Sequence, residues 1–181
     1  PPPPPPGGTV RVGDAQYTYQ PLYVAGLQNE PTYTYVWIPL GVTLSAGGSV
    51  TVGDAQYTKQ QCYIEALENE PSCSYAWYNL GVTLSAGGSV TVGDARFTDQ
   101  QCYVEALENE PSCSYAWYNL GVTLSTGGSV TVGDAQYTDQ QCYIEVLKNE
   151  PTYSNVWNSL GVTLSAGGSV TVGDAQYTKQ Q

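Results

Sequence analysis

The side chains that most often carry out chemistry are unevenly supplied in this sequence of 181 residues. It contains 16 acidic residues and five cysteines, but no histidine. Histidine is the commonest general base and metal ligand, so its absence excludes any Ser/His/Asp or Cys/His site within the chain. No other catalytic constellation stands out, and we expect a protein that is not an enzyme and holds no cofactor or metal.

Carboxylates recur in two patterns that invite a chemical reading. A Gly-Asp pair stands at 53–54, 93–94, 133–134 and 173–174. Calcium would need several oxygen ligands, whereas each pair offers one carboxylate, so turn chemistry is the favoured reading. Glu65, Glu68 and Glu70, with their copies, repeat along one helix face and are best explained as a solvated surface.

The cysteines follow no zinc-binding spacing. Cys62 stands near the start of an expected helix and Cys73 beyond its end, too far apart for a disulfide within that pair. We expect Cys62, Cys102 and Cys142 to form a column of small buried residues. Their odd number also leaves an intermolecular disulfide open.

A strict repeat organises these residues. The motif GVTLS begins at Gly41, Gly81, Gly121 and Gly161, which gives a period of 40 residues. The first copy is more divergent, and PPPPPP replaces its beginning. Such regularity predicts an array in which each unit packs mainly on its neighbours.

The first part of each unit predicts a helix within residues 74–88. Its apolar positions have helical spacing and are Trp77, Leu80, Gly81 and Leu84. Ser72 or Ser74 is expected to cap its start, and Gly87-Gly88 to supply a left-handed stop.

The second part predicts a β-hairpin. Apolar and polar residues alternate on both sides of Gly53-Asp54, which suits a type I′ or II′ turn. In that register Val52 faces Ala55 and Val50 faces Tyr57. The apolar face must lie on a helix or on the next hairpin, because an isolated hairpin is marginal in water. Equivalent hairpins are expected near 9–18, 49–58, 89–98, 129–138 and 169–178.

The third part predicts a second helix within residues 58–71. Thr58 and Gln61 form a capping box at its start, and Pro71 closes it. Tyr63, Ala66 and Leu67 form the inward stripe.

Together these residues resemble the tetratricopeptide repeat. The matching positions are Ala76-Trp77, Leu80-Gly81, Leu84, Tyr103, Ala106-Leu107 and Pro111. The usual period is 34 residues, and the hairpin accounts for the excess here. The resemblance implies a helical solenoid that presents a surface to partner proteins without catalysis. We therefore expect an α+β repeat solenoid of helix–β-hairpin–helix units, mostly helical, with an arm at 1–8 and one solenoid of about four repeats at 9–181.

Charge and composition narrow the partners. The net charge of −11 disfavours nucleic acid, and no apolar run is long enough for a membrane span. The sequence has no Met and begins with Pro, so we expect a processed chain or part of a longer one. It has no N-linked sequon, and any covalent glycan would be O-linked. The candidate acceptors are Ser49, Thr51, Thr58, Thr91, Thr131 and Thr171.

The hexaproline is expected to be a stiff polyproline II rod. Three roles remain open for it: a spacer, a ligand for an aromatic groove, or a hydroxylated and glycosylated arm.

The two ends of the array are complementary. A second helix is expected at about 19–30 with no first helix before it. A first helix is expected at about 155–166 with no second helix after it. Head-to-tail contact between copies would therefore give an open filament, and we expect an extracellular or cell-surface homopolymer. The candidate joint residues are Pro1, Pro6, Tyr19, Tyr23, Leu27, Trp157, Leu160 and Leu164. The alternative is a tetratricopeptide-type interaction scaffold excerpted from a longer repeat protein.

Overall fold

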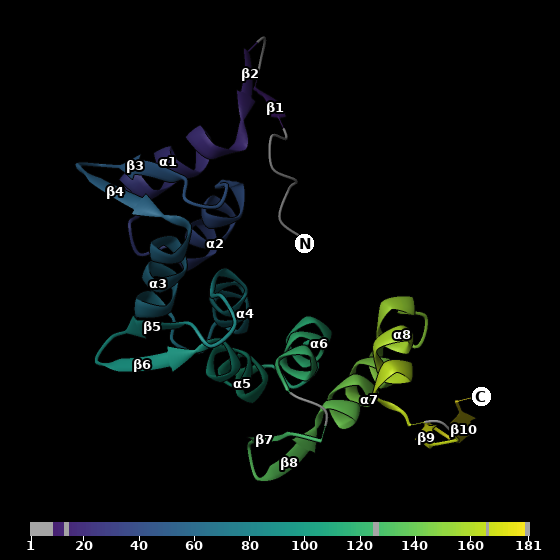
Figure 1. Ribbon diagram of the computed structural model, residues 1–181. Coiled ribbons are helices and arrows are strands. Elements are labelled where there is room, and N and C mark those ends of the chain that lie inside the picture. Colours follow the sequence, from purple (N-terminus) through teal and green to yellow (C-terminus); the bar gives the residue numbers. More distant parts are fainter. Residues whose placement is uncertain (1–8, 13–14, 125–126, 166, 180–181) are drawn as a thin grey trace. The chain divides into compact units, whose positions relative to one another are not determined.

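A computed structural model describes residues 9–12, 15–124, 127–165 and 167–179. Those residues form eight α-helices and ten β-strands (Figure 1). The chain divides into two compact units, residues 1–99 and 100–181, which are described separately below. The predicted arm at 1–8 lies outside the described residues, and the prediction of a single solenoid stays a prediction.

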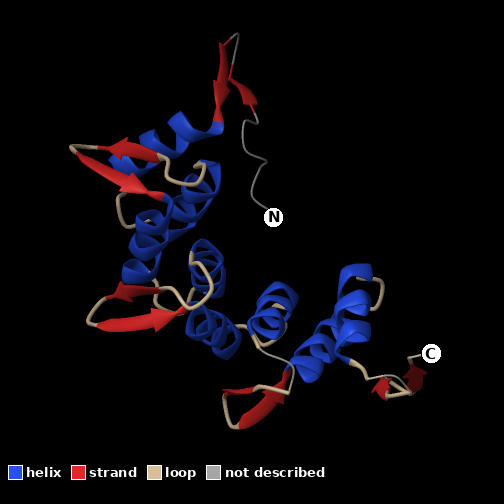
Figure 2. Cartoon of the chain, viewed as in Figure 1, coloured by secondary structure: helices blue, strands red, loops and turns tan. Residues whose placement is uncertain are grey.

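The elements follow the predicted order in both units. Residues 1–99 hold β1 (Thr9–Val12), β2 (Ala15–Thr18), α1 (Tyr19–Asn29), α2 (Thr34–Thr43), β3 (Ser49–Val52), β4 (Ala55–Thr58), α3 (Lys59–Asn69), α4 (Ser74–Thr83), β5 (Ser89–Val92) and β6 (Ala95–Thr98). At the boundary begins α5 (Asp99–Asn109), followed by α6 (Ser114–Thr123), β7 (Ser129–Val132), β8 (Ala135–Thr138), α7 (Asp139–Asn149), α8 (Ser154–Thr163), β9 (Ser169–Val172) and β10 (Ala175–Thr178). Figure 2 shows the same alternation of helix pairs and hairpins, which confirms the predicted α+β repeat fold.

Each hairpin has the predicted register. Val52 lies opposite Ala55, and Val50 lies opposite Tyr57. Gly53 has a φ of +61°, and among the described residues only glycines have a positive φ. A positive φ at the first turn residue alone is the type II′ pattern, so the structure decides between the two predicted turns.

The apolar face of the hairpin packs on the helix that precedes it. The centroid of the Tyr57 ring lies 4.8 Å from that of Trp37 on α2. The same pair recurs at closely similar spacing in three other places, as Trp77–Phe97, Trp117–Tyr137 and Trp157–Tyr177. Four of the five described hairpins are thus supported by an aromatic contact with the helix that precedes them, one of the two positions predicted for the apolar face.

A second recurrent contact fixes the turn between helices. The indole Nε1 of Trp77 donates to the backbone oxygen of Pro71 over 2.8 Å. The same bond joins three further pairs at 2.7 or 2.8 Å: Trp37 to Pro31, Trp117 to Pro111 and Trp157 to Pro151. The tryptophan therefore holds the hairpin with its ring and the preceding turn with its N–H group.

The second helices begin as predicted. Thr58 and Gln61 form a capping box at α3, and Thr138 and Gln141 form one at α7. Thr18 makes no side-chain cap bond to α1. The physical reason is Pro21, which stands at the position whose backbone N–H the threonine would accept, and proline has no N–H group.

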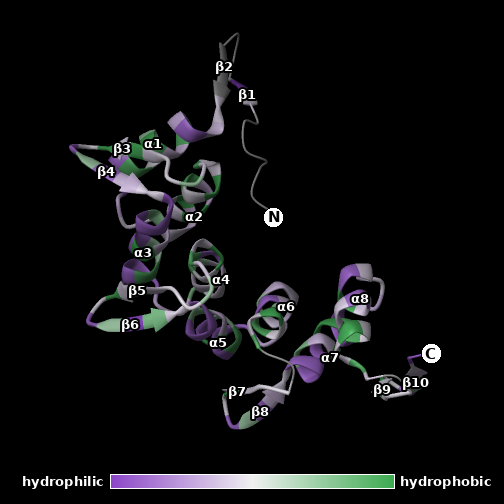
Figure 3. Ribbon diagram, in the orientation of Figure 1, coloured by the Kyte–Doolittle hydropathy of each residue, from purple (hydrophilic) through white to green (hydrophobic). Residues whose placement is uncertain are grey.

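The inward stripes also follow the prediction. Tyr63, Ala66 and Leu67 are buried on α3, together with Cys62. Figure 3 shows hydrophilic and hydrophobic residues alternating around the helices, as this one-sided packing requires.

The predicted cap of the first helix is wrong. The N-cap of α4 is Cys73, without a side-chain cap bond. Its backbone oxygen instead accepts from the N–H groups of Ala76 and Trp77, while the hydroxyl of Ser72 donates to Glu70. The Ser74 hydroxyl is buried and has no hydrogen-bond partner.

The predicted end of this helix is also wrong. The α4 helix ends at Thr83, and Leu84 is extended rather than helical. The hydroxyl of Thr83 bonds the backbone oxygen of Leu80, and the N–H of Leu84 bonds Gly81. Gly87 has a left-handed φ of +75°, but it shapes the turn that leads into the hairpin instead of stopping the helix.

Thr138→Ala is expected to lower the free energy of unfolding by about 1 kcal/mol, because it removes a helix cap. Thr18→Ala is the matched control and is expected to change it much less, since Thr18 makes no cap bond. Urea unfolding of both variants measures the difference. Equal decreases in the free energy of unfolding of the two variants would contradict this account of the two helix starts.

Candidate functional site

A close contact between helices is made where a glycine of the first helix meets a tyrosine of the second. A Cβ atom added to Gly41 on α2 would lie 2.6 Å from Cε1 of Tyr63 and 3.2 Å from Cβ of Cys62. In the second compact part, residues 100–181, a Cβ added to Gly121 on α6 would lie 2.8 Å from Cε1 of Tyr143. Only glycine permits this approach, because real Cβ atoms do not come so close to a ring.

The second helix supplies a complementary pair of side chains. Cys62 is fully buried and Tyr63 is 2% exposed, and the equivalent Cys142 and Tyr143 are buried in the same way. Burial raises the pKa of both Cys62 and Cys142 to about 12. It also raises the pKa of Tyr63 well above the usual range. The glycine, the cysteine and the tyrosine thus form a dry, uncharged contact, which we call the glycine–tyrosine contact.

The same face of α8 is open. A Cβ added to Gly161 would have no heavy atom within 4 Å, although Gly161 occupies the repeat position of Gly41 and Gly121. A hollow of about 160 Å³ lies there, with Trp157, Leu164 and Tyr177 in its lining.

A backbone oxygen at the edge of this hollow is already bonded. The Lys179 Nζ donates to the backbone oxygen of Leu164 over 3.0 Å. Lys179 also lines the hollow, so its cation sits at the edge of an otherwise apolar surface.

The complementary face of α1 is also incompletely covered. Leu22 and Tyr23 occupy the repeat positions of Cys62 and Tyr63, yet both are only half-buried. The Tyr23 ring stacks on Tyr19 with their centroids 6.3 Å apart. Partial burial is the main cause that raises the pKa of Tyr23, and the neighbouring Tyr19 adds to the increase.

The predicted joint residues are distributed over these two faces. Tyr19 and Tyr23 lie on α1, and Trp157 and Leu164 line the α8 hollow. Leu27 and Leu160 are buried within the chain, and Pro1 and Pro6 lie outside the described residues. Gly161 and Leu22 were missed, although the Leu-Gly pair within each first helix was a usable signal for a close helix approach.

The predicted O-glycosylation residues are all exposed. Two of them also have structural roles: the Ser49 hydroxyl accepts from Gln56, and the Thr58 hydroxyl caps α3. The remaining four occupy one equivalent strand position and are Thr51, Thr91, Thr131 and Thr171. Each stands on the polar face of its hairpin.

The Gly-Asp pairs lie at the tips of the hairpins, as turn chemistry predicts. Asp54 and Asp134 are exposed there, one carboxylate to each turn. Within the part of the chain that the structure describes, no three Cys, Asp or Glu side chains gather as a metal site would require.

The acidic helix surface is self-repelling. Partial burial and the nearby Glu68 raise the pKa of Glu65. The same two causes, with Glu108 as the neighbour, raise the pKa of Glu105. Like charges on one helix face explain both neighbour effects.

Comparison with known proteins adds no relative. The sequence matches no protein-family model, and no curated protein was found that is similar to it. The resemblance to the tetratricopeptide repeat therefore stays a prediction. Among the described residues, no helix is both long enough and apolar enough to cross a membrane.

Cys62 and Cys142 are expected to resist iodoacetamide in the folded chain. Burial disfavours the thiolate, so their labelling should begin only as the pH approaches their raised pKa of about 12. In urea the labelling should instead increase as the pH rises through 9.0, which is the ordinary pKa of a cysteine thiol. Peptide mapping after labelling measures each site, with the half-buried Cys73 as the internal comparison. Rapid labelling of Cys62 in the folded chain at pH 8 would contradict the dry contact.

Proposed function

We propose that this chain is a structural protein that assembles head to tail into a filament, with α1 of one copy seated on α8 of the next. The observation that carries the proposal is the open Gly161. Two of its equivalents, Gly41 and Gly121, are each covered by a tyrosine ring. Tyr23 of a second copy would repeat that arrangement.

Both halves of the missing contact are present on each copy. The α8 helix offers the glycine, and α1 offers the half-buried Leu22 and Tyr23. Leu22 replaces the cysteine found in α3 and α7, so the new contact would bury a larger aliphatic side chain. Because the two faces differ, the contact is heterologous, and heterologous contacts propagate into open assemblies unless the rotation closes a ring.

The energetics require more than one tyrosine. Full burial of a large apolar side chain contributes about 1.5–3 kcal/mol, whereas association costs at least about 4 kcal/mol in lost freedom. Leu22 and Tyr23 are already half-buried, so burying the rest of them gains less than this and does not offset the cost. The half-buried Trp157 and Tyr177, which is 44% exposed, supply additional apolar surface from the lining of the hollow.

The chain composition suits an external fibre. The repeated acidic helix surface keeps the assembly soluble, and the exposed threonines of the hairpins offer sites for O-linked sugars along it. We therefore place the filament outside the cell or at its surface.

Gly161→Leu is expected to abolish assembly without harming the fold. The Cβ atom of the leucine would have no heavy atom within 4 Å, and leucine favours a helix more than glycine does, but the side chain would occupy the space that the Tyr23 ring needs. Sedimentation velocity and electron microscopy should show filaments of the unaltered chain and monomers of the variant. Thermal unfolding of the monomeric variant should show an intact fold.

Gly121→Ala is the matched control, because the same position is covered there. Its Cβ would lie 2.8 Å from the Tyr143 ring, so this variant should lose stability. A monodisperse monomer of the unaltered chain would rule out the filament. Filaments of Gly161→Leu would show that the joint lies elsewhere.

Intact-mass measurement of the native material tests the sugar. The mass is expected to exceed that of the bare polypeptide, and peptide mapping should place the increment on Thr51, Thr91, Thr131 or Thr171. A mass equal to the bare chain would remove the glycan from the proposal and leave the filament unaffected.

A second candidate function is a protein-interaction scaffold. Exposed apolar residues on the first helices favour it: Tyr75 and Val82 are 60% and 51% exposed and lie seven residues apart on α4. Residues at that spacing share one helix face. Tyr115 and Val122 repeat the arrangement on α6. Because the residue types are the same on the two helices, each helix face would suit the same partner, and this favours a repetitive partner over a unique peptide.

A further inference from the structure

A cluster of tyrosines lies within residues 100–181, where α7 packs beside α6 and α8 (Figure 1). The ring centroid of Tyr118 on α6 lies 6.0 Å from that of Tyr143 on α7. It also lies 6.0 Å from the ring centroid of Tyr153, the N-cap of α8, and the two ring planes are inclined by 32°. Burial is the main cause that raises the pKa of Tyr153, and the nearby Tyr115 and Tyr118 add to the increase. We call these four residues the tyrosine cluster.

The members of the tyrosine cluster differ in their access to solvent. Tyr143 is 5% exposed, whereas Tyr115 is 50% exposed. Tyr118 and Tyr153 are half-buried. A small oxidant in solution can therefore reach the Tyr118–Tyr153 pair, while the surrounding chain keeps the two rings together.

The fold does not depend on tyrosine at both of these positions. In other repeats the position of Tyr153 holds Cys73 or Cys113, and the position of Tyr118 holds Ile38 in one of them. The same helices form in all of those repeats. Among the successive pairings of these two positions along the sequence, only this one consists of two tyrosines, so the needs of packing do not explain it.

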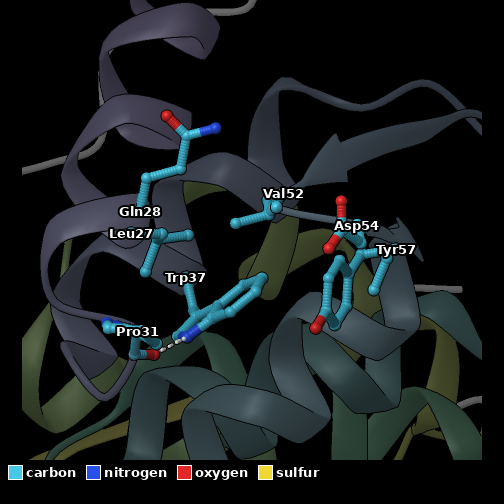
Figure 4. Close-up of a pocket in the computed structure, with 9 residues that line it drawn as sticks. Leu27, Gln28, Pro31, Trp37, Val52, Asp54 and Tyr57 are labelled. Atoms are coloured by element: carbon cyan, nitrogen blue, oxygen red, sulfur yellow. Dashed lines mark hydrogen bonds between the residues drawn. The ribbon is translucent and has the colours of Figure 1, made fainter.

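Other tyrosines of the described residues are placed differently. Tyr57, Tyr137 and Tyr177 each pack on a tryptophan, as Figure 4 shows for Tyr57. Two local pairs have a ring spacing similar to that of the cluster, and each lies within one short segment: Tyr19–Tyr23 at 6.3 Å and Tyr33–Tyr35 at 6.1 Å. A bond within either local pair would join no separate elements, whereas Tyr118 and Tyr153 belong to different helices.

Two phenols held side by side can be joined by oxidation. A one-electron oxidant removes one electron and one proton from each phenol, which leaves two phenoxyl radicals. The radicals couple through a new carbon–carbon bond between the ring carbons ortho to the oxygens. Each ring then transfers its ortho hydrogen to its own oxygen, which restores both phenols. Hydrogen peroxide takes up the two electrons and two protons and becomes two molecules of water.

We propose that Tyr118 and Tyr153 are a cross-linking site, at which hydrogen peroxide and a peroxidase-type one-electron oxidant join the two rings as dityrosine. The bridge fixes α6 to the start of α8 and closes a loop of the sequence that contains β7, β8 and α7. A covalent link of this kind restricts the unfolded chain, as a disulfide does. The bridge forms within a single copy, so the proposal goes beyond the assembly of copies and does not depend on it.

Proximity favours coupling within the pair. Groups held in one chain meet at an effective concentration on the order of millimolar or more. Exposed tyrosines on separate copies in a micromolar solution meet far less often. Rotation of partly exposed side chains takes picoseconds to nanoseconds, so the two rings have time to turn their ortho carbons into contact.

The experiment uses the full-length chain with Gly161→Leu, which keeps copies apart, at micromolar concentration. A haem peptide with peroxidase activity and hydrogen peroxide are added, and the monomer is isolated by denaturing electrophoresis and digested with trypsin. Trypsin cuts after Lys148, so Tyr118 and Tyr153 fall in separate peptides, residues 97–148 and 149–179. Mass spectrometry should find these peptides joined with the loss of two hydrogens. A disulfide cannot join them, because residues 149–179 contain no cysteine.

Two substitutions on one helix identify the reacting residue. Tyr118→Phe keeps the ring but removes the phenol, so it should preserve the fold and lower the yield of the joined peptide at least about tenfold, because the held partner is lost. Tyr115→Phe is the matched control in the same tryptic peptide and should retain the link. Thermal unfolding should show that both variants are folded before oxidation.

Three results would overturn the proposal. The first is absence of the joined peptide from the monomer while the local pairs, which lie in the tryptic peptide 12–59, lose two hydrogens. The second is a joined peptide that appears only in cross-linked dimers. The third is an undiminished yield in Tyr118→Phe. None of these results bears on the joint at Gly161, which is tested separately by the assembly of the unaltered chain.

Discussion

The structure depends on one close approach, in which a first helix meets a second helix through a glycine and a tyrosine ring. Gly41 and Gly121 leave no room for any side chain of their own. The tyrosine and the adjacent cysteine then seal the contact against water, which is why their acidic groups are held in the neutral form. The remaining elements either bring these two helices together or cover what they leave exposed.

The hairpin lengthens the connection between the two helices without loosening their contact. It has only four residues in each strand, too few to be stable alone. Its stability comes from an aromatic ring that packs on the tryptophan of the preceding helix. The ring centroids lie 4.6 to 4.8 Å apart in the four hairpins that follow a helix pair or helix. The replacement of tyrosine by Phe97 preserves that contact, because the packing uses the ring and not the hydroxyl.

The sequence was sufficient to predict several features that rest on periodicity. The hairpin register, the Thr58 capping box and the burial of Tyr63, Ala66 and Leu67 all follow from spacing and residue type. The helix ends did not follow, because the N-cap of α4 is Cys73, whose backbone oxygen accepts from Ala76 and Trp77 while no side chain caps the helix. Preferences for capping residues describe side chains, and they fail where a tight turn supplies a backbone acceptor instead.

The candidate joint was predictable only in part. A joint between α8 and α1 of two copies could be hypothesised by counting helices in the sequence, but the proposed role of Gly161 required the distances around Gly41 and Gly121. Whether a tyrosine ring covers a glycine depends on which helices are neighbours, and this is known only from the fold.

The tryptophan–proline hydrogen bond has a consequence for how the chain finds its fold. Nearly identical units give each second helix several equally suitable partners, and this ambiguity favours misassembly in repeat proteins. The bond from Trp77 to Pro71 spans only six residues, so it forms with little loss of chain entropy. We therefore expect this bond to close early in folding and to commit each helix to its neighbour along the chain before the interchangeable long-range contacts can compete.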